Sequence, residues 1–301
     1  MKVSALIFSM NRIENVIRLA NKIKDYVDEI VIVDSSSRKN FEILKRKLKF
    51  AKVYWLPPIG VVELYRQIGI NLCSNDWILQ FDDDEEPSIE LMQEILKFKS
   101  KNEEPSAKVF LIKRIEKKGF SMLCRFFNRK YVELTGVIHW GYKIKTTDIS
   151  KLPGYIVHHD EYGKNINKLI KKLQRYAVVE AYQWWYKVRH SLMSSKIPIK
   201  KFQNFTIRNP LLIWILANAY LVYYLILWIR SRHIFLGILY CLLILVEINR
   251  SFKKYLKIWK YMNDKTPIKL LRLNSIKDVE RWTLHPENGI RNFIKIMEII
   301  K

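Results

Sequence analysis

The sequence has few cysteines, and the motifs of several common classes of protein are missing from it. Its three cysteines, Cys73, Cys124 and Cys241, are far apart and form no Cys-x-x-Cys pair. This spacing argues against structural disulfides and favours a reducing compartment. Neither a zinc-finger spacing nor the aromatic signature of an RNA-binding module is present. The N-terminus lacks a basic segment followed by a long apolar stretch, so we expect no signal peptide.

Acidic residues are also scarce relative to basic ones. The chain has 53 Lys and Arg against 29 Asp and Glu, which gives a formal net charge of +24 at pH 7. Such an excess favours an anionic partner, which can be nucleic acid, anionic lipid or a nucleotide phosphate. Because no nucleic-acid-binding motif accompanies the charge, we expect no nucleic acid as a partner. A nucleic-acid-binding protein stays the weakest of the alternatives.

Strand-like and helix-like segments alternate over the first hundred residues. Buried strands are predicted at 3–8, 30–33, 53–56 and 77–81, with apolar residues at helical spacing between them. This alternation predicts an α/β fold with a mostly parallel sheet flanked by helices. Beyond residue 109, short strand-like runs separated by glycines predict mixed or antiparallel strands that extend the sheet.

Two helix starts are predicted from capping residues. Asn11, with Glu14 three residues later, has the pattern of a capped helix start, and Ser88 has the same character. The residues expected to face inward from the helix after Ser88 are Ile89, Met92, Ile95 and Leu96.

Three consecutive aspartates, Asp82, Asp83 and Asp84, follow the apolar run 77–81. Adjacent carboxylates repel one another, and burying them without a partner is costly. Side chains alternate along an extended backbone, so we expect Asp82 and Asp84 to face one side and Asp83 the other. A divalent cation such as Mg²⁺ or Mn²⁺ prefers oxygen ligands of this kind. The competing interpretation is a solvated acidic turn.

The position of these aspartates favours a ligand site. Asp34 ends the strand-like run 30–33, as Asp82 and Asp84 end the run 77–81. In open parallel sheets, ligands bind beyond the carboxyl ends of the strands. The acidic residues of both runs are therefore expected at the edge of the sheet where a ligand would bind.

Two apolar segments follow in the C-terminal part of the chain. Residues 211–229 carry no charge over 19 positions, and 234–246 is a second, shorter apolar run. Basic residues interleaved with aromatic ones come next, as in an amphipathic helix on an anionic membrane. A spanning hairpin, a pair of helices lying in the membrane surface and a buried hairpin in a soluble protein are the alternatives. We expect membrane-associated helices on the cytoplasmic face of the cell membrane.

Together these segments resemble the family 2 glycosyltransferases, which have the GT-A fold. The resemblance lies in residues 31–37 (VIVDSSS), 80–85 (QFDDDE), 125–129 (RFFNR), 136–139 (GVIH) and 155–159 (YIVHH). The sequence is similar in particular to the branch of lipopolysaccharide-core and lipid-linked sugar transferases. The resemblance covers about residues 1–190, so we expect a catalytic domain there and a membrane-associated helical region over 191–301.

The resemblance implies a nucleotide diphosphate sugar as donor and a metal ion, Mn²⁺ or Mg²⁺, as cofactor. The implied nucleotide-binding residues are Ser9, Asn11, Asp34 and Asp82, and the implied metal ligands are Asp82, Asp84 and His159, with His158 as the alternative histidine. The implied catalytic residues are Asp84, His139 and Asp160.

The general base is the weakest part of the resemblance. Trp140 stands where a carboxylate follows the histidine in the related branch. Asp160, Glu161 and Glu133 are the substitutes, and a lipid phosphate acceptor would need no base because it is already ionised. We therefore expect inverting transfer to a polyprenyl phosphate or another lipid-linked or glycan acceptor. A scaffold that binds the nucleotide sugar without turnover is the alternative.

Overall fold

The computed structural model describes residues 1–56, 62–116, 119–134, 142–159, 209–229 and 234–258, with residues 173–174, 176–177 and 180–181. Its described residues up to 159 belong to one compact unit, and those from 173 onward belong to a second.

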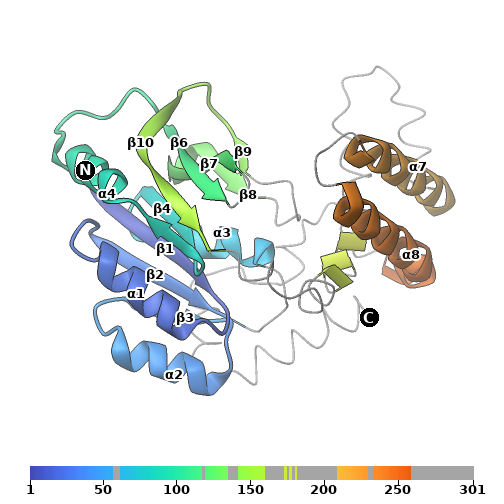
Figure 1. The fold of residues 1–301 in the computed structure, drawn as a ribbon, viewed down its shortest axis with the longest axis horizontal. Coiled ribbons are helices and arrows are strands. Elements are labelled where there is room, and N and C mark those ends of the chain that lie inside the picture. The colour runs from blue at the N-terminus through green and yellow to red at the C-terminus, as the bar shows by residue number, and fades with distance from the viewer. Residues whose placement is uncertain are drawn as a thin grey trace. The chain divides into compact units, whose positions relative to one another are not determined.

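An eight-stranded sheet forms the centre of the first unit (Figure 1). Its strands are β1 (Val3–Ser9), β2 (Glu29–Asp34), β3 (Lys52–Trp55), β4 (Trp77–Asp82), β5 (Glu85–Pro87), β6 (Val109–Glu116), β7 (Gly119–Asn128) and β10 (Ile149–His158). They lie in the order β3-β2-β1-β4-β7-β6-β10-β5. The flanking helices are α1 (Ile13–Ile23), α2 (Arg38–Lys47), α3 (Glu63–Leu72) and α4 (Ile89–Ser100). A 3-10 turn, η1 (Arg129–Tyr131), leads into a separate hairpin of β8 (Val132–Leu134) and β9 (Tyr142–Ile144).

The sheet has a parallel half and a mixed half. Strands β3, β2, β1 and β4 are parallel to one another. Strand β7 is antiparallel to both β4 and β6, while β10 is parallel to β6 and antiparallel to β5. The predicted α/β sheet with flanking helices is confirmed, and so is its mixed extension beyond residue 109.

The core lies between the sheet and its helices. An aromatic cluster joins β4, β6, β7 and α4, with ring centroids 4.7 Å apart for Trp77–Phe98 and for Phe98–Phe126. Such aromatic contacts add to the apolar area that the rings bury. They fix β4, and with it the acidic residues that follow, against the mixed half of the sheet.

Two local predictions differ from the structure. The predicted cap of α1 is absent: Asn11 has φ 62°, and the N-cap residue is Arg12, whose side chain makes no capping hydrogen bond. In α4, Ser88 does cap the helix by accepting from the Leu91 N–H. Of the residues predicted to face inward, Met92 and Ile95 are buried, whereas Ile89 and Leu96 are exposed (65% and 41%). The buried face of α4 consists of Leu91, Met92, Ile95 and Phe98.

The second unit contains helices α7 (Pro210–Ile229) and α8 (Ile234–Ile258), which pack against each other. A polar contact links them: Trp214 Nε1 donates to Asn249 Oδ1 at 3.0 Å, and Asn249 donates to Asn218 Oδ1 at 3.0 Å. Large apolar side chains stay exposed along α7, at Leu211, Ile215, Val222 and Ile226.

Neither α7 nor α8, nor any other helix in the described part of the chain, has the length and apolar character needed to cross a membrane. The membrane association expected for 211–229 and 234–246 stays a prediction. The basic residues beyond 258 lie outside the described residues.

Candidate functional site

The acidic residues lie where the strand order of the sheet changes direction. Strand β1 has β2 on one side and β4 on the other, so that Ser9 is the partner of Asp34 and Phe8 the partner of Asp82. Crevices beyond the carboxyl ends of such strands are the usual ligand sites of open α/β sheets. The loops after β1, β2 and β4 therefore meet at one edge and form the candidate site.

Asp34 is the buried carboxylate of this edge. It is fully buried, and burial raises the pKa of its carboxyl to about 6, although hydrogen bonds from Ser36 lower it in part. Ser36 Oγ donates to Asp34 at 2.7 Å and accepts from the Asn11 backbone N–H at 2.7 Å. The left-handed conformation of Asn11 turns its N–H toward Ser36, so β1 and β2 are tied together beyond their ends.

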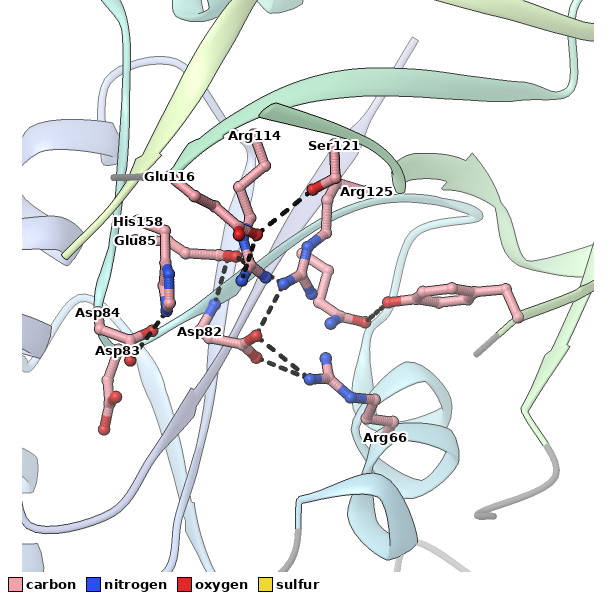
Figure 2. A network of polar contacts seen from close by, with 12 residues as sticks. Arg66, Asp82, Asp83, Asp84, Glu85, Arg114, Glu116, Ser121, Arg125 and His158 are labelled. Carbon is pink, nitrogen blue, oxygen red and sulfur yellow. Dashed lines mark hydrogen bonds and ion pairs between the residues drawn. The ribbon is translucent and has the colours of Figure 1, made fainter. Parts of the chain in front are cut away.

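Asp82 is held by two arginines (Figure 2). Arg125 Nη2 donates to Asp82 at 2.7 Å, and Arg66 Nη2 donates at 3.0 Å. Burial raises the pKa of the Asp82 carboxyl, but the charges of Arg125 and Arg66 outweigh burial and hold the pKa well below its usual range. Asp82 is therefore ionised and balanced by cationic side chains from α3 and β7.

Glu85 belongs to the same network and follows the acidic turn formed by Asp83 and Asp84. Its side chain is fully buried, accepts from Arg125 at 2.6 Å and from Arg114 at 3.3 Å, and also accepts from the Asp82 backbone N–H at 2.9 Å. Arg125 thus bridges Asp82 and Glu85. The turn is fixed by charge-assisted hydrogen bonds, which are stronger than neutral ones.

Asp83 and Asp84 point to a different set of partners. The Met10 backbone N–H donates to Asp83 at 2.9 Å, and Arg12 Nη1 lies 3.3 Å from Asp83 and 2.7 Å from Asp84. Burial raises the pKa of Asp83 to about 7, although Met10 and Arg12 act in the other direction. For Asp84, burial also raises the pKa, but His158 and Arg12 outweigh it and the pKa falls below its usual value.

The two neighbouring histidines are placed differently. His158 Nε2 lies 3.5 Å from Asp84 Oδ2, and Figure 2 shows the two side chains facing each other. His159 is half exposed, and its ring lies 3.3 Å from Glu86, whose carboxylate also binds Lys22 at 2.5 Å. Only the backbone N–H of His159 contacts Asp84, by donating to its carbonyl oxygen at 2.8 Å. The imidazole beside the acidic turn therefore belongs to His158.

The structure groups the three aspartates differently from the alternation expected for a strand. Asp82 faces Arg66 and Arg125, while Asp83 and Asp84 share Arg12. The reason is that β4 ends at Asp82, so the residues after it no longer alternate as in a strand. Asp82, Asp84 and His159 are therefore not brought together, and no group of three or more His, Cys, Asp or Glu side chains within the described ranges is arranged to hold a metal ion.

The remaining predicted residues have mixed placements. Ser9, Asn11 and Asp34 lie together at the ends of β1 and β2. His139 and Asp160, predicted as catalytic residues, lie outside the described residues.

Sequence reasoning did not assign Arg12, Arg66 or Arg125 to the site. Only Arg125 had a local signal, because it opens the segment RFFNR that carried part of the resemblance.

This site lies within the segment matched by a known protein family. The family model Glycosyl transferase family 2 matches residues 4–160, which is more than half of the chain. The chain belongs to glycosyl transferase family 2. It is an enzyme of the glycosyltransferase class, as the resemblance implied.

Relatives of this chain in Rickettsia are also described as glycosyltransferases. An uncharacterized glycosyltransferase of Rickettsia conorii is 29% identical over 220 residues, which cover 62% of this chain and 77% of the relative. One of Rickettsia bellii is 31% identical over 148 residues, covering 46% and 50%. Among solved structures, TarS of S. aureus, residues 1–349 in complex with UDP, is 13% identical with a TM-score of 0.39. That comparison covers 85% of this chain and 92% of the TarS chain in the 1–349 structure.

Asp84 and His158 have close to the spacing of two neighbouring ligands of one divalent cation. Ligands of an octahedral ion lie about 3 Å apart when each is about 2.1 Å from the metal. Asp84 Oδ2 and His158 Nε2 are 3.5 Å apart, so a small movement brings both within reach of one ion. Two protein ligands suffice for such an ion, because substrate phosphates and water fill the remaining positions.

Proposed function

We propose that this family 2 glycosyltransferase transfers a sugar, with inversion, from a nucleotide diphosphate sugar in the presence of Mn²⁺ or Mg²⁺. The observation that carries the proposal is that Asp84 and His158 lie at the same edge of the sheet as Asp34, the last residue of β2. A nucleoside binds hydrogen-bond acceptors, and the cation of a diphosphate binds ligands such as a carboxylate or an imidazole. Both are present at the switch point of the sheet.

Asp34 is proposed to accept hydrogen bonds from the base or ribose of the donor. A buried carboxylate is a strong acceptor, and Ser36 keeps it in one orientation by donating to it at 2.7 Å. Ser9 is the strand partner of Asp34, and Asn11 donates its backbone N–H to Ser36. A nucleoside that donates to Asp34 would make a charge-assisted hydrogen bond with a buried carboxylate.

Asp84 and His158 are proposed to hold the cation. When bound, the cation offsets the negative charge that builds up on the leaving diphosphate. Asp82 is not assigned as a ligand, because its carboxylate oxygens already accept from Arg66 and Arg125. Its proposed role is to orient these two arginines at the edge of the site, where their charges add to the attraction for an anionic donor.

The acceptor is proposed to be a lipid-linked group, either a polyprenyl phosphate or a glycan on a lipid carrier. A lipid phosphate is ionised at neutral pH, so transfer of a sugar to it needs no general base. Helix α7 supports this proposal, because Leu211, Ile215, Val222 and Ile226 stay exposed along it. With the excess of basic residues, such apolar side chains favour binding to the surface of an anionic membrane. We propose that the chain lies on the cytoplasmic face of the cell membrane.

Transfer is tested with the purified chain, a panel of sugar nucleotides and polyprenyl phosphate, with and without Mn²⁺. We expect a glycolipid product that needs the cation, and a loss of about a hundredfold or more in kcat/KM for Asp84→Asn. Asp25→Asn, which makes the same chemical change at an exposed position, is the control. Equal rates with and without chelator, or full activity of Asp84→Asn, would contradict the proposal. Binding of the nucleotide sugar without any product would favour a non-catalytic scaffold instead.

Membrane binding is tested separately by flotation with vesicles. We expect the chain to float with vesicles that contain anionic lipid, and Ile215→Glu with Val222→Glu to reduce the bound fraction several-fold, because charges on the apolar face oppose insertion. Ile89→Glu is the matched control, since Ile89 is similarly exposed on α4 of the first unit. Equal flotation of the α7 variant and the control would exclude α7 as the membrane-binding surface.

A further inference from the structure

Arg12 already occupies the carboxylate to which the proposed cation would bind. Its guanidinium Nη1 lies 2.7 Å from Asp84 Oδ2 and 3.3 Å from Asp83 Oδ1. The Arg12 side chain is 15% exposed, and the side chains of Asp83 and Asp84 are 14% and 17% exposed. These ion pairs are therefore largely shielded from water, which makes them stronger than ion pairs at an exposed surface.

The backbone around Arg12 sets its position. The Met10 N–H donates to Asp83 Oδ2 at 2.9 Å, and the Asn11 N–H donates to Ser36 Oγ at 2.7 Å. The loop is thus attached to the acidic turn on one side and to the end of β2 on the other. Arg12 follows directly and starts α1, so its guanidinium is delivered to Asp83 and Asp84 by a loop that is itself fixed.

One oxygen atom of Asp84 serves two partners. Its Oδ2 is 2.7 Å from Arg12 Nη1 and 3.5 Å from His158 Nε2. A divalent ion bound between Asp84 and His158 would share this oxygen with the guanidinium. Two cations at such a short distance repel each other strongly in a site that excludes most water. The ion and Arg12 cannot both keep Asp84 without a large loss of affinity.

We propose that Arg12 is a positioning residue that competes with the divalent cation for Asp84. Before the cation binds, the single positive charge of Arg12 offsets part of the charge of Asp83 and Asp84, and Arg12 leaves Asp84 when the cation arrives with the donor. The diphosphate then offers the displaced guanidinium a new anionic partner. The inference rests on the proposed function, since it takes Asp84 and His158 as the cation's ligands.

This competition makes cation and donor binding cooperative. Without a diphosphate, the ion must break the 2.7 Å contact between Arg12 and Asp84 and is repelled by the guanidinium charge nearby, so the affinity for the ion alone is low. With a diphosphate present, the cost of displacing Arg12 is smaller. The same coupling must appear whichever ligand is varied, because coupling free energies between two bound ligands are reciprocal.

The test is Mn²⁺ binding to the purified full chain without any nucleotide, measured from the electron paramagnetic resonance signal of free Mn²⁺. We expect Arg12→Gln to bind Mn²⁺ about tenfold or more tightly than the natural chain, because the competing charge is gone. Arg46→Gln is the matched control, since it removes one positive charge from an exposed position on α2. It is expected to leave the affinity unchanged. Arg12→Met replaces Arg12→Gln should the latter not give folded protein by circular dichroism.

The results separate this inference from the proposed function. The gain in affinity must disappear in Arg12→Gln with Asp84→Asn, which would place the ion on Asp84. An Arg12→Gln variant that binds Mn²⁺ no more tightly than the natural chain would overturn the competition and leave the metal site standing. A gain that survives Asp84→Asn would also overturn it. If neither chain binds Mn²⁺, even with UDP or GDP added, both the inference and the metal-dependent function fail.

Discussion

Replacing Arg125 with methionine tests the charge network that joins Asp82 and Glu85. Methionine keeps much of the side-chain volume but removes the guanidinium, which is 4% exposed and bridges Asp82 at 2.7 Å and Glu85 at 2.6 Å. Glu85, which is fully buried, would then keep only Arg114 at 3.3 Å and the Asp82 backbone N–H as partners. Asp82 would keep Arg66.

The expected loss follows from the cost of leaving buried carboxylates short of a partner. Removing one member of a buried ion pair costs about 3 to 5 kcal/mol. Because Arg66 and Arg114 remain, we expect the lower end, about 3 kcal/mol at pH 7.5. For a unit of this size that corresponds to a melting temperature about 6 to 12 °C lower.

The pH dependence of this loss has a definite sign. Burial raises the pKa of Glu85, and Arg125 counteracts it. Without Arg125 the pKa rises further, so Glu85 takes up a proton as the pH falls and the buried charge disappears. The destabilisation of Arg125→Met must therefore shrink between pH 7.5 and pH 5.

Urea and thermal unfolding of the full chain measure this effect. Arg129→Met is the matched control: it lies next to the same strand, but its ion pair with Asp76 is about a third exposed, and we expect a loss within about 1 kcal/mol. Adding Glu85→Gln to Arg125→Met should restore part of the stability, since the unpaired charge is gone. A loss below about 0.5 kcal/mol for Arg125→Met, or one that grows toward pH 5, would contradict the stabilising role of Arg125 between Asp82 and Glu85.

Two further predictions concern stability. Burial raises the folded-state pKa of Asp34 to about 6, whereas the unfolded chain titrates near the ordinary value, so ionising Asp34 removes stability as the pH rises from about 4 to 6. Asp34→Asn should therefore be more stable than the natural chain by about 2 to 3 kcal/mol at pH 7.5 and equal to it at pH 4, while nucleotide binding is lost; urea titrations and calorimetry at both pH values check this. Gly154→Ala should cost about 2 to 5 kcal/mol in thermal unfolding, because φ is +86° and the added Cβ would lie 2.4 Å from the Leu91 backbone nitrogen. Lys151→Ala, at an exposed position of the same strand, should change little.

The parallel half of the sheet was predictable from sequence within one or two residues. Strands β1 to β4 are nearly continuous apolar runs, and runs of this kind are typical of strands covered on both faces. Past residue 109 the pattern gave strands but not their order, because pairing such as β10 with β5 depends on contacts between segments far apart in the sequence.

The partners of the acidic run were not predictable. Arg66 precedes Asp82 by 16 residues and Arg125 follows it by 43, so no local pattern links them. The sequence also left open whether His158 or His159 lies beside Asp84. His158 is the last residue of β10 and His159 follows it, so their directions depend on where the strand ends.

Asp84 and His158 are the proposed ligands of the cation that binds the donor diphosphate. Calorimetry of nucleoside diphosphate binding, with and without Mn²⁺, tests this assignment in His158→Ala and His159→Ala. The diphosphate is the one among UDP, GDP, CDP and ADP that stabilises the chain most in a thermal shift screen. We expect His158→Ala to lose the Mn²⁺-dependent part of the affinity and His159→Ala to keep it. Loss in His159→Ala alone, or unchanged Mn²⁺ dependence in His158→Ala, would contradict the assignment.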